Sequence, residues 1–145
     1  MPPPDFIPFE EAEHTADLAL IARGRDLPEL VLNACRGALS LIGDASGLTP
    51  ETWVPLTASA AEPERLLVRF VRELLLAWET HGGLPVAVEM DPAAGDATEL
   101  HGRVAFAYPD DLADRIQSLP KAATYHDLTI RRVGDLLETT LVLDV

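Results

Sequence analysis

The sequence predicts an α+β domain with two layers: a mostly antiparallel mixed sheet and two helices packed on one face of it. Three observations indicate this class. Apolar residues recur every three or four positions in two long segments, 27–43 and 63–82, which is the period of a helix. Shorter β-prone segments surround them. Helices and strands do not strictly alternate, which favours α+β over a doubly wound parallel fold, although the β-α-β-α opening leaves some parallel pairing open.

The first predicted elements are a strand at 17–24 and a helix that stops near Gly43. The strand is apolar and ends at a turn glycine. Asp26 is the expected N-cap of the helix, because its side chain can accept an early backbone N–H. Glu29 completes a capping-box-like pattern three residues later.

The rest of the chain predicts one more helix and several strands. Pro55 lacks an N–H to donate, so the strand at 52–60 is expected at a sheet edge or bulge. The segment 63–82 has the clearest helical period of the sequence. Further strands are expected at 84–90 and 99–108, as a hairpin, and in the tail 121–145, joined through Val-Gly-Asp.

Composition places the chain among ordinary globular proteins. Its 145 residues are expected to form a single domain, 1–145. A net charge of −13 argues against direct binding of nucleic acid or anionic membranes, and it suits a basic protein partner or a bound cation. The single cysteine, Cys35, lies on a predicted apolar helix face, and the N-terminus lacks the pattern of a signal peptide. We therefore expect a cytoplasmic protein.

Ionisable groups gather in the segment "EHTAD", Glu13 to Asp17, directly before the first apolar run. With the two-residue period of a strand, Thr15 and Asp17 point to one side and His14 to the other. Two readings stay open from the pattern alone: a solvated entry into a strand, or a functional site.

The chain ends in "LDV", which offers Asp144 and the terminal carboxylate of Val145. If the first and last strands were neighbours, Asp17 and Asp144 would lie close together. Two carboxylates about 4 Å apart repel by roughly 4 kcal/mol at an effective dielectric near 20, and a bound cation removes that cost. Carboxylate and carbonyl oxygens suit calcium, magnesium or manganese, whereas zinc prefers histidine or thiolate. An acidic chain end that only aids solubility is the alternative.

A third charged segment is "KAATYHDL", which begins at Lys121. It offers a positioned cation followed by a possible acid/base pair, or simply a strand with one snorkelling lysine. The familiar nucleotide-binding, zinc-protease and serine-hydrolase motifs are absent. Two general hypotheses therefore remain from the residues: a chaperone-like binding module, and an independent metal-dependent hydrolase that uses Asp17, Asp144 and His14.

Taken together, these motifs resemble the archease family, small acidic proteins that assist RNA ligation. The resemblance rests on "EHTADLAL", a capped helix ending in "IGD", "LLVRFVRELLLAW", "KAATYHDLTI" and the terminal "LVLDV". It implies a two-layer α+β fold and a partner role rather than a reaction catalysed alone. Archeases act with the RNA-splicing ligase that joins 3′-phosphate and 5′-hydroxyl ends. They promote guanylylation of the ligase histidine with GTP, and its multiple turnover in tRNA splicing and RNA repair.

The resemblance also implies a divalent-metal site, with calcium as the expected ion and magnesium or manganese as alternatives. Its ligands would be Asp17, Asp144 and Val145. Lys121 and His14 become candidates for contact with the nucleotide or the partner. This chain departs from the family pattern "W-L-N-E-L-L" in the second helix, where Phe70 and Arg72 replace the tryptophan and asparagine, and Pro120 replaces a glycine-containing approach to the lysine.

Overall fold

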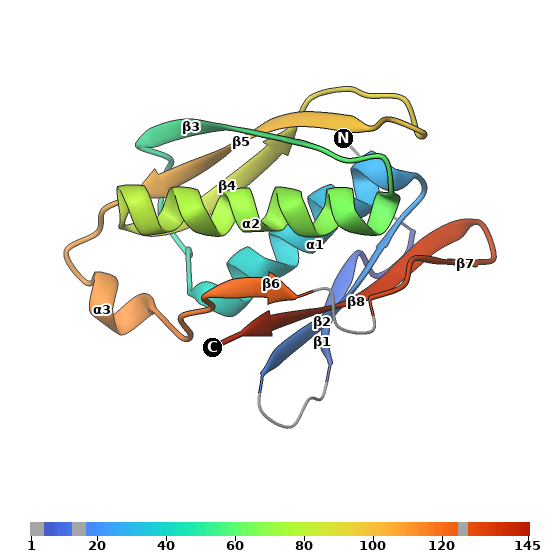
Figure 1. The fold of residues 1–145 in the computed structure, drawn as a ribbon. Helices are drawn as coiled ribbons and strands as arrows, with labels where there is room; N and C mark the ends of the chain where they lie inside the picture. Colours follow the sequence, from blue (N-terminus) through green and yellow to red (C-terminus); the bar gives the residue numbers. More distant parts are fainter. Residues whose placement is uncertain (1–4, 13–16, 125–127) are drawn as a thin grey trace.

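The computed structural model describes residues 5–12, 17–124 and 128–145, and it confirms the α+β class (Figure 1). Every strand pairing among these residues is antiparallel. The structure differs from the expected single mixed sheet in one respect, because its strands divide into a five-stranded and a three-stranded sheet. None of the helices in the described part of the chain combines the length and the apolar composition needed to cross a bilayer.

The five-stranded sheet has the order β1-β2-β8-β6, and β7 also pairs with β8. The expected first strand is β2, and β8 lies beside it over seven residue pairs, from Leu18↔Leu143 to Gly24↔Leu137. The N-terminal strand β1 was not predicted, because its two adjacent glutamates lower its β-propensity. The strands are β1 (Phe9–Ala12), β2 (Leu18–Gly24), β6 (Ala122–Thr124), β7 (Arg131–Val133) and β8 (Leu136–Asp144).

The three-stranded sheet has the order β3-β5-β4 and contains the predicted hairpin. Pro55 lies in β3, at the edge of this sheet, as its missing N–H predicts. The division into two sheets follows from β2, whose two sides are taken by β1 and β8, so that the strand after the first helix pairs elsewhere. The strands are β3 (Thr52–Ser59), β4 (Leu84–Met90) and β5 (Glu99–Ala107).

Both predicted helices are present, α1 (Leu27–Ile42) and α2 (Pro63–His81), and a short helix α3 (Leu112–Arg115) lies between β5 and β6. The Asp26 side chain caps α1 by accepting the N–H of Glu29 at 3.0 Å. The Glu29 carboxylate accepts the N–H of Arg25, one residue before the expected capping-box partner, at 2.8 Å. The α1 boundaries therefore follow from local sequence.

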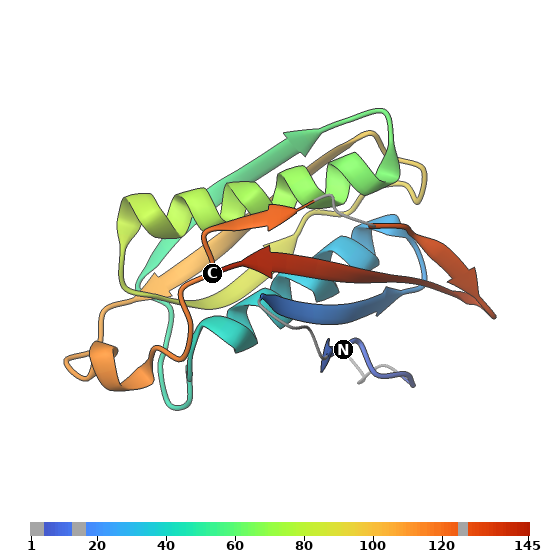
Figure 2. The same ribbon diagram turned by 60° about the horizontal axis from the view of Figure 1, so that its bottom comes forward.

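The two long helices join the two sheets into one core (Figures 1 and 2). Helix α1 packs on β2 and β4, whereas α2 lies between β3 and β6, so each helix contacts both sheets. Fully buried side chains from both sheets and both helices fill the space between them. The largest include Leu20, Leu30, Phe70, Phe106 and Leu141.

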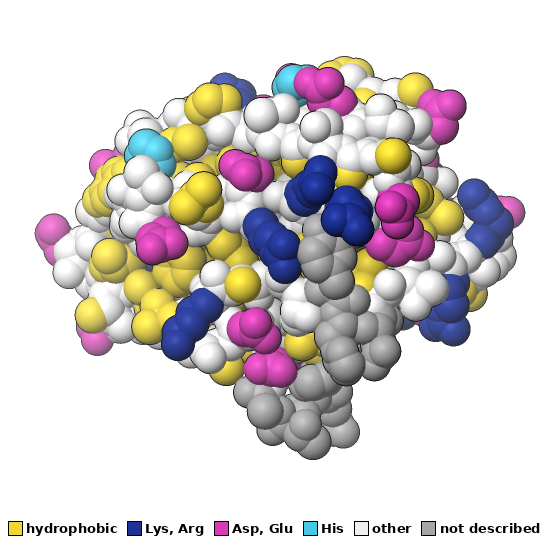
Figure 3. All heavy atoms as spheres, in the orientation of Figure 1, with side chains coloured by type: hydrophobic (Ala, Val, Ile, Leu, Met, Phe, Trp, Pro, Cys, Tyr) yellow, Lys and Arg dark blue, Asp and Glu magenta, His cyan; other side chains and the backbone are white. Residues whose placement is uncertain are grey.

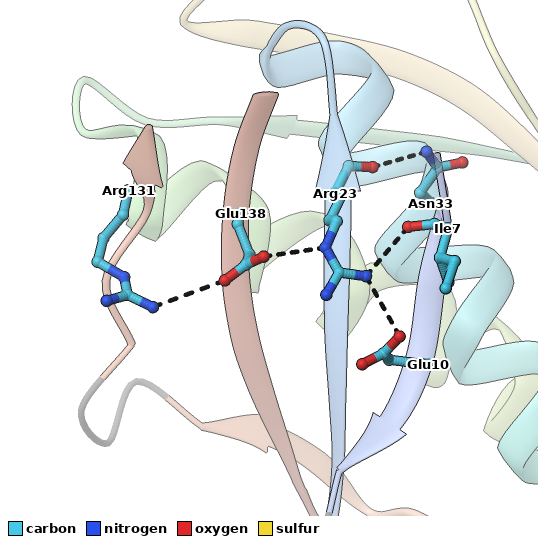
Figure 4. Close-up of polar contacts among 6 residues, drawn as sticks. All are labelled: Ile7, Glu10, Arg23, Asn33, Arg131 and Glu138. Atoms are coloured by element: carbon cyan, nitrogen blue, oxygen red, sulfur yellow. Dashed lines mark hydrogen bonds and ion pairs between the residues drawn. The ribbon is translucent and has the colours of Figure 1, made fainter. Parts of the chain in front are cut away.

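A charged cluster ties the outer strands together around Arg23 on β2 (Figure 4). Arg23 Nε donates to Glu138 on β8 at 2.9 Å, and Nη1 donates to the carbonyl of Ile7 at 3.2 Å. Glu138 also pairs with Arg131 on β7, at 3.6 Å. Buried Asn33 on α1 donates to the Arg23 carbonyl at 2.7 Å. This end of the sheet is thus held by cross-strand ion pairs, while the opposite end carries the predicted site.

The buried Cys35 thiol should make stability depend on pH. Burial raises its pKa from 9.0 to about 12. Above about pH 9 the unfolded chain loses a proton that the folded chain keeps, so the free energy of unfolding should fall as pH rises from about 9 to about 12. Urea unfolding at pH 8, 10 and 11 measures this fall, and Cys35→Ala should flatten it. An equal fall in Cys35→Ala would contradict this role of the thiol.

Candidate metal and partner site at the end of the five-stranded sheet

The register of β2 against β8 brings the two predicted carboxylates to the same end of the sheet. Leu18 pairs with Leu143; Asp17 directly precedes the first and Asp144 directly follows the second. In an antiparallel pair, these two positions face one another across the strands. The condition that the first and last strands be neighbours is therefore confirmed, and the role of the two carboxylates as ligands remains a prediction.

Strand β6 brings Lys121 to the other side of Asp144. Ala122 pairs with Asp144, and the N–H of Lys121 donates to the carbonyl of Asp144 at 2.7 Å. Figures 1 and 2 both place the end of the chain beside the start of β6. Lys121, the only lysine of the sequence, thus joins Asp17 and Asp144 although the three residues are far apart in sequence.

The side chains at this end are accessible to a partner. Lys121 and Asp144 are exposed, Asp17 is half-buried, and Val145 is 50% exposed. Lys121 and Val145 line a pocket of about 500 Å³ together with residues 116–119. Leu119, one of its lining residues, is 61% exposed. The end of the sheet therefore combines charged groups with exposed apolar surface.

The donor atoms at this end fit a hard cation. Asp17 and Asp144 offer carboxylate oxygens and Val145 offers a main-chain carbonyl, the ligands that calcium and magnesium take. Within residues 5–12, 17–124 and 128–145, no group of three His, Cys, Asp or Glu side chains could hold a metal ion. A site built from these described residues would therefore need main-chain oxygens in addition to the two aspartates.

Some predicted residues lie outside the part of the chain that the structure describes. His14, with Glu13 and Thr15, falls in the segment 13–16, and the aromatic and histidine that follow Lys121 fall in 125–127. The structure therefore does not test the role of His14, which stays a prediction.

The structure adds a residue that the sequence indicated only as a departure from the family pattern. Arg72 on α2 donates its Nε to the carbonyl of Ala123 on β6, at 2.9 Å. No local pattern indicates this contact, because 51 residues separate the two groups. Its departure from the family pattern was the one signal in the sequence.

A pocket with a larger volume lies elsewhere. It has a volume of about 660 Å³ between the end of α1 and β4, and none of the predicted site residues lines it. Asp44, at its rim, accepts hydrogen bonds from the hydroxyl and the N–H of Ser46, which lower the pKa of its carboxyl. These bonds close a local turn after α1, so size alone does not identify the candidate site.

Comparison with known proteins finds matches over most of the chain. Residues 9–145 match the family model described as "Archease protein family (MTH1598/TM1083)". A protein archease from Aeropyrum pernix is 29% identical over 139 residues, covering 92% of this chain and 94% of its own. One from Saccharolobus islandicus is 30% identical over 140 residues, covering 94% and 98%.

Two solved structures share the fold. The solution structure of Methanobacterium thermoautotrophicum protein 1598 has a TM-score of 0.78 at 23% identity and covers 95% of this chain and 99% of its own. The crystal structure of a Thermotoga maritima protein, described as "an archease, possible chaperone", has a TM-score of 0.67 at 25% identity and covers 94% and 96%. The two-sheet arrangement is therefore shared across these chains.

The opposed carboxylates should cost stability when no cation is present. Like charges directly opposite on neighbouring strands are destabilising, so Asp144→Asn in EDTA at low salt should raise the free energy of unfolding by about 0.2–1 kcal/mol. Urea unfolding measures it. Asp135→Asn is the matched control, because Asp135 is exposed and directly precedes the other end of β8. A gain equal to that of the control would show only the effect of net charge.

Proposed function

The chain belongs to the archease family, and we propose that it activates the RNA-splicing ligase that joins 3′-phosphate and 5′-hydroxyl ends. In this proposal it promotes guanylylation of the ligase histidine and its multiple turnover, and it has no reaction of its own. The observation that carries the proposal is the convergence of Asp17, Asp144 and Lys121 at one end of the sheet. The family match supports the same role.

The two aspartates and the C-terminal residue are the proposed ligands of a divalent cation. Their oxygens are hard donors, and the register of β2 and β8 holds them opposite one another. A bound cation would offset the charge of the carboxylates and supply a Lewis acid for phosphate oxygens. Asp17 and Asp144 thus act in this proposal as ligands and not as acids or bases.

Lys121 is the proposed contact to the nucleotide phosphates or to the ligase. Its main chain is fixed by the hydrogen bond to Asp144, while its side chain is exposed. A fixed ammonium group can stabilise negative charge that develops on phosphate oxygens during nucleotidyl transfer. In this role the exposed ammonium group binds an external anion.

Docking on the ligase is proposed to be transient and steered by charge. The net charge of −13 favours fast association with a basic surface, and it disfavours direct binding of RNA. Exposed Leu119 and Val145 add apolar contact area beside the charged residues. An activator that serves many turnovers must also leave, which suits association dominated by charge.

A chaperone-like role is the second candidate, because the Thermotoga maritima structure is described as a possible chaperone. It predicts suppression of client aggregation that survives loss of Asp17. An independent hydrolase would instead show turnover by the purified chain alone. Neither role needs the ligase, so the ligase assay separates both from the proposed function.

The proposed function predicts that the chain stimulates guanylylation of its cognate ligase in GTP and manganese. Asp17→Asn and Asp144→Asn should lower the rate of stimulated guanylylation about tenfold or more, because each removes a ligand. Lys121→Ala should lower it about 100-fold if the ammonium acts on developing charge. Radiolabelled GTP transfer to the ligase measures these rates.

Asp135→Asn serves as the control in this assay, since it removes the same charge at the far end of β8. Its stimulation should equal that of the unaltered chain. The proposed function is wrong if the unaltered chain gives no stimulation, or if the Asp17 and Asp144 variants stimulate as well as the control.

Metal binding is a separate prediction. Calcium at 100 times its dissociation constant should stabilise the folded chain by about 2.7 kcal/mol, which raises the melting temperature by several degrees. Asp17→Asn and Asp144→Asn should lose this shift, and Asp135→Asn should keep it. Thermal unfolding with and without millimolar calcium measures the effect. Equal shifts in all three variants would place the ion elsewhere.

A further inference from the structure

Helix α2 carries a row of basic residues on its exposed side. Arg65, Arg69 and Arg72 are exposed and lie four and three residues apart, so they share one side of the helix. Figure 3 shows basic side chains gathered over α2, on a chain whose net charge is −13. A solvated helix face would explain the row, but the contacts of two of these arginines are specific.

Arg69 and Arg72 reach carbonyl groups on the edge strands of the two sheets. Arg69 Nη1 donates to the carbonyl of Ser59, the last residue of β3, at 2.7 Å. Arg72 Nε donates to the carbonyl of Ala123, the middle residue of β6, at 2.9 Å. Strands β3 and β6 each end the strand order of their sheet. Each of the two arginines therefore links α2 to the edge strand of one sheet by a hydrogen bond to a main-chain carbonyl.

The strand that Arg72 contacts is short. Strand β6 has three residues, and among the described strands it pairs with β8. Ala123 is 1% exposed, but a methyl group buries little apolar area. A hydrogen bond from a guanidinium is about twice as strong as one between neutral groups. The bond from Arg72 thus adds a charge-assisted contact on the side of β6 that faces α2.

Lys121 directly precedes this strand. Its N–H donates to Asp144 on the β8 side, while Ala123, two residues later, accepts from Arg72 on the α2 side. The short segment from Lys121 to Ala123 therefore makes hydrogen bonds both to β8 and to α2. Loss of the Arg72 contact removes the hydrogen bond on the α2 side of this segment and keeps its pairing with β8.

We propose that Arg72 is a positioning residue for Lys121: its bond to the Ala123 carbonyl fixes β6 against α2 and thereby fixes Lys121 beside Asp144. The importance of Lys121 rests on the proposed function, whereas its placement by Arg72 rests on the contacts alone. Arginine suits this task because its planar guanidinium offers several N–H donors and loses less freedom per bond than a lysine side chain.

The test compares amide hydrogen exchange in Arg72→Met and Arg69→Met. Methionine keeps the apolar stem and removes the donors, and Arg69 is the matched control because it bonds a carbonyl of the other sheet. The measured quantity is the exchange rate of the Lys121 amide divided by that of the Leu20 amide in the core, which corrects for global unfolding.

In Arg72→Met this ratio should rise about tenfold, and in Arg69→Met it should change less than about twofold. Arg72→Lys should give an intermediate ratio, and it replaces Arg72→Met if that variant does not fold. The proposal is overturned if Arg72 variants leave the ratio unchanged, or if Arg69→Met raises it as much.

A kinetic measurement links placement to activity. Arg72→Met should lower the ligase guanylylation rate at saturating activator about tenfold, while the activator concentration that gives half of the maximal rate stays the same. A changed half-saturating concentration with an unchanged maximal rate would instead make Arg72 a docking residue and overturn the positioning role. If the unaltered chain gives no stimulation, the proposed function fails, and the exchange ratio still decides the role of Arg72.

Discussion

The pairing of β2 with β8 is the constraint on which the rest of the structure depends. It joins the first predicted strand to the last over seven residue pairs and occupies the middle of the larger sheet. A shift of β2 by one residue would turn Leu20, which is fully buried against α1 and β8, away from the core. The same shift would separate Asp17 from Asp144. One register therefore sets both the packing of the core and the geometry of the candidate site.

The two ends of the β2–β8 pair differ in how their charged side chains are arranged. At one end, Glu138 lies between Arg23 and Arg131 on neighbouring strands, so negative charge is paired within the sheet. At the other end, Asp17 and Asp144 face one another with Lys121 nearby. Carboxylates on an accessible edge are suited to a cation or a basic partner. The second end is therefore the one that we propose as functional.

Helix α2 is what makes two separate sheets into one domain. Phe70 on its apolar side packs in the core. On its exposed side, Arg69 donates a hydrogen bond to β3 and Arg72 donates one to β6. Exposed carbonyls on edge strands invite pairing with other chains, and these two arginines cover part of each edge. Lys121 directly precedes β6. The hydrogen bond from Arg72 to β6 therefore links α2 to the five-stranded sheet and, in our proposal, also positions Lys121.

The sequence by itself determined the elements that local physics controls. The spacing of apolar residues located both long helices, Asp26 set the start of α1, and Pro55 indicated an edge strand. These depend on residues a few positions apart, so they can be read without the fold. The sequence also indicated Asp17, Asp144 and Lys121 as candidates, through the resemblance of their motifs to a family.

Only the tertiary structure decided how distant segments meet. The weak strand β1 and the division into two sheets depend on which edges of β2 are already taken. The approach of Asp17 to Asp144 depends on a register set by the whole core. The role of Arg72 depends on a carbonyl 51 residues away. Contacts of this kind are chosen by the packing of all elements together, and no local pattern encodes them.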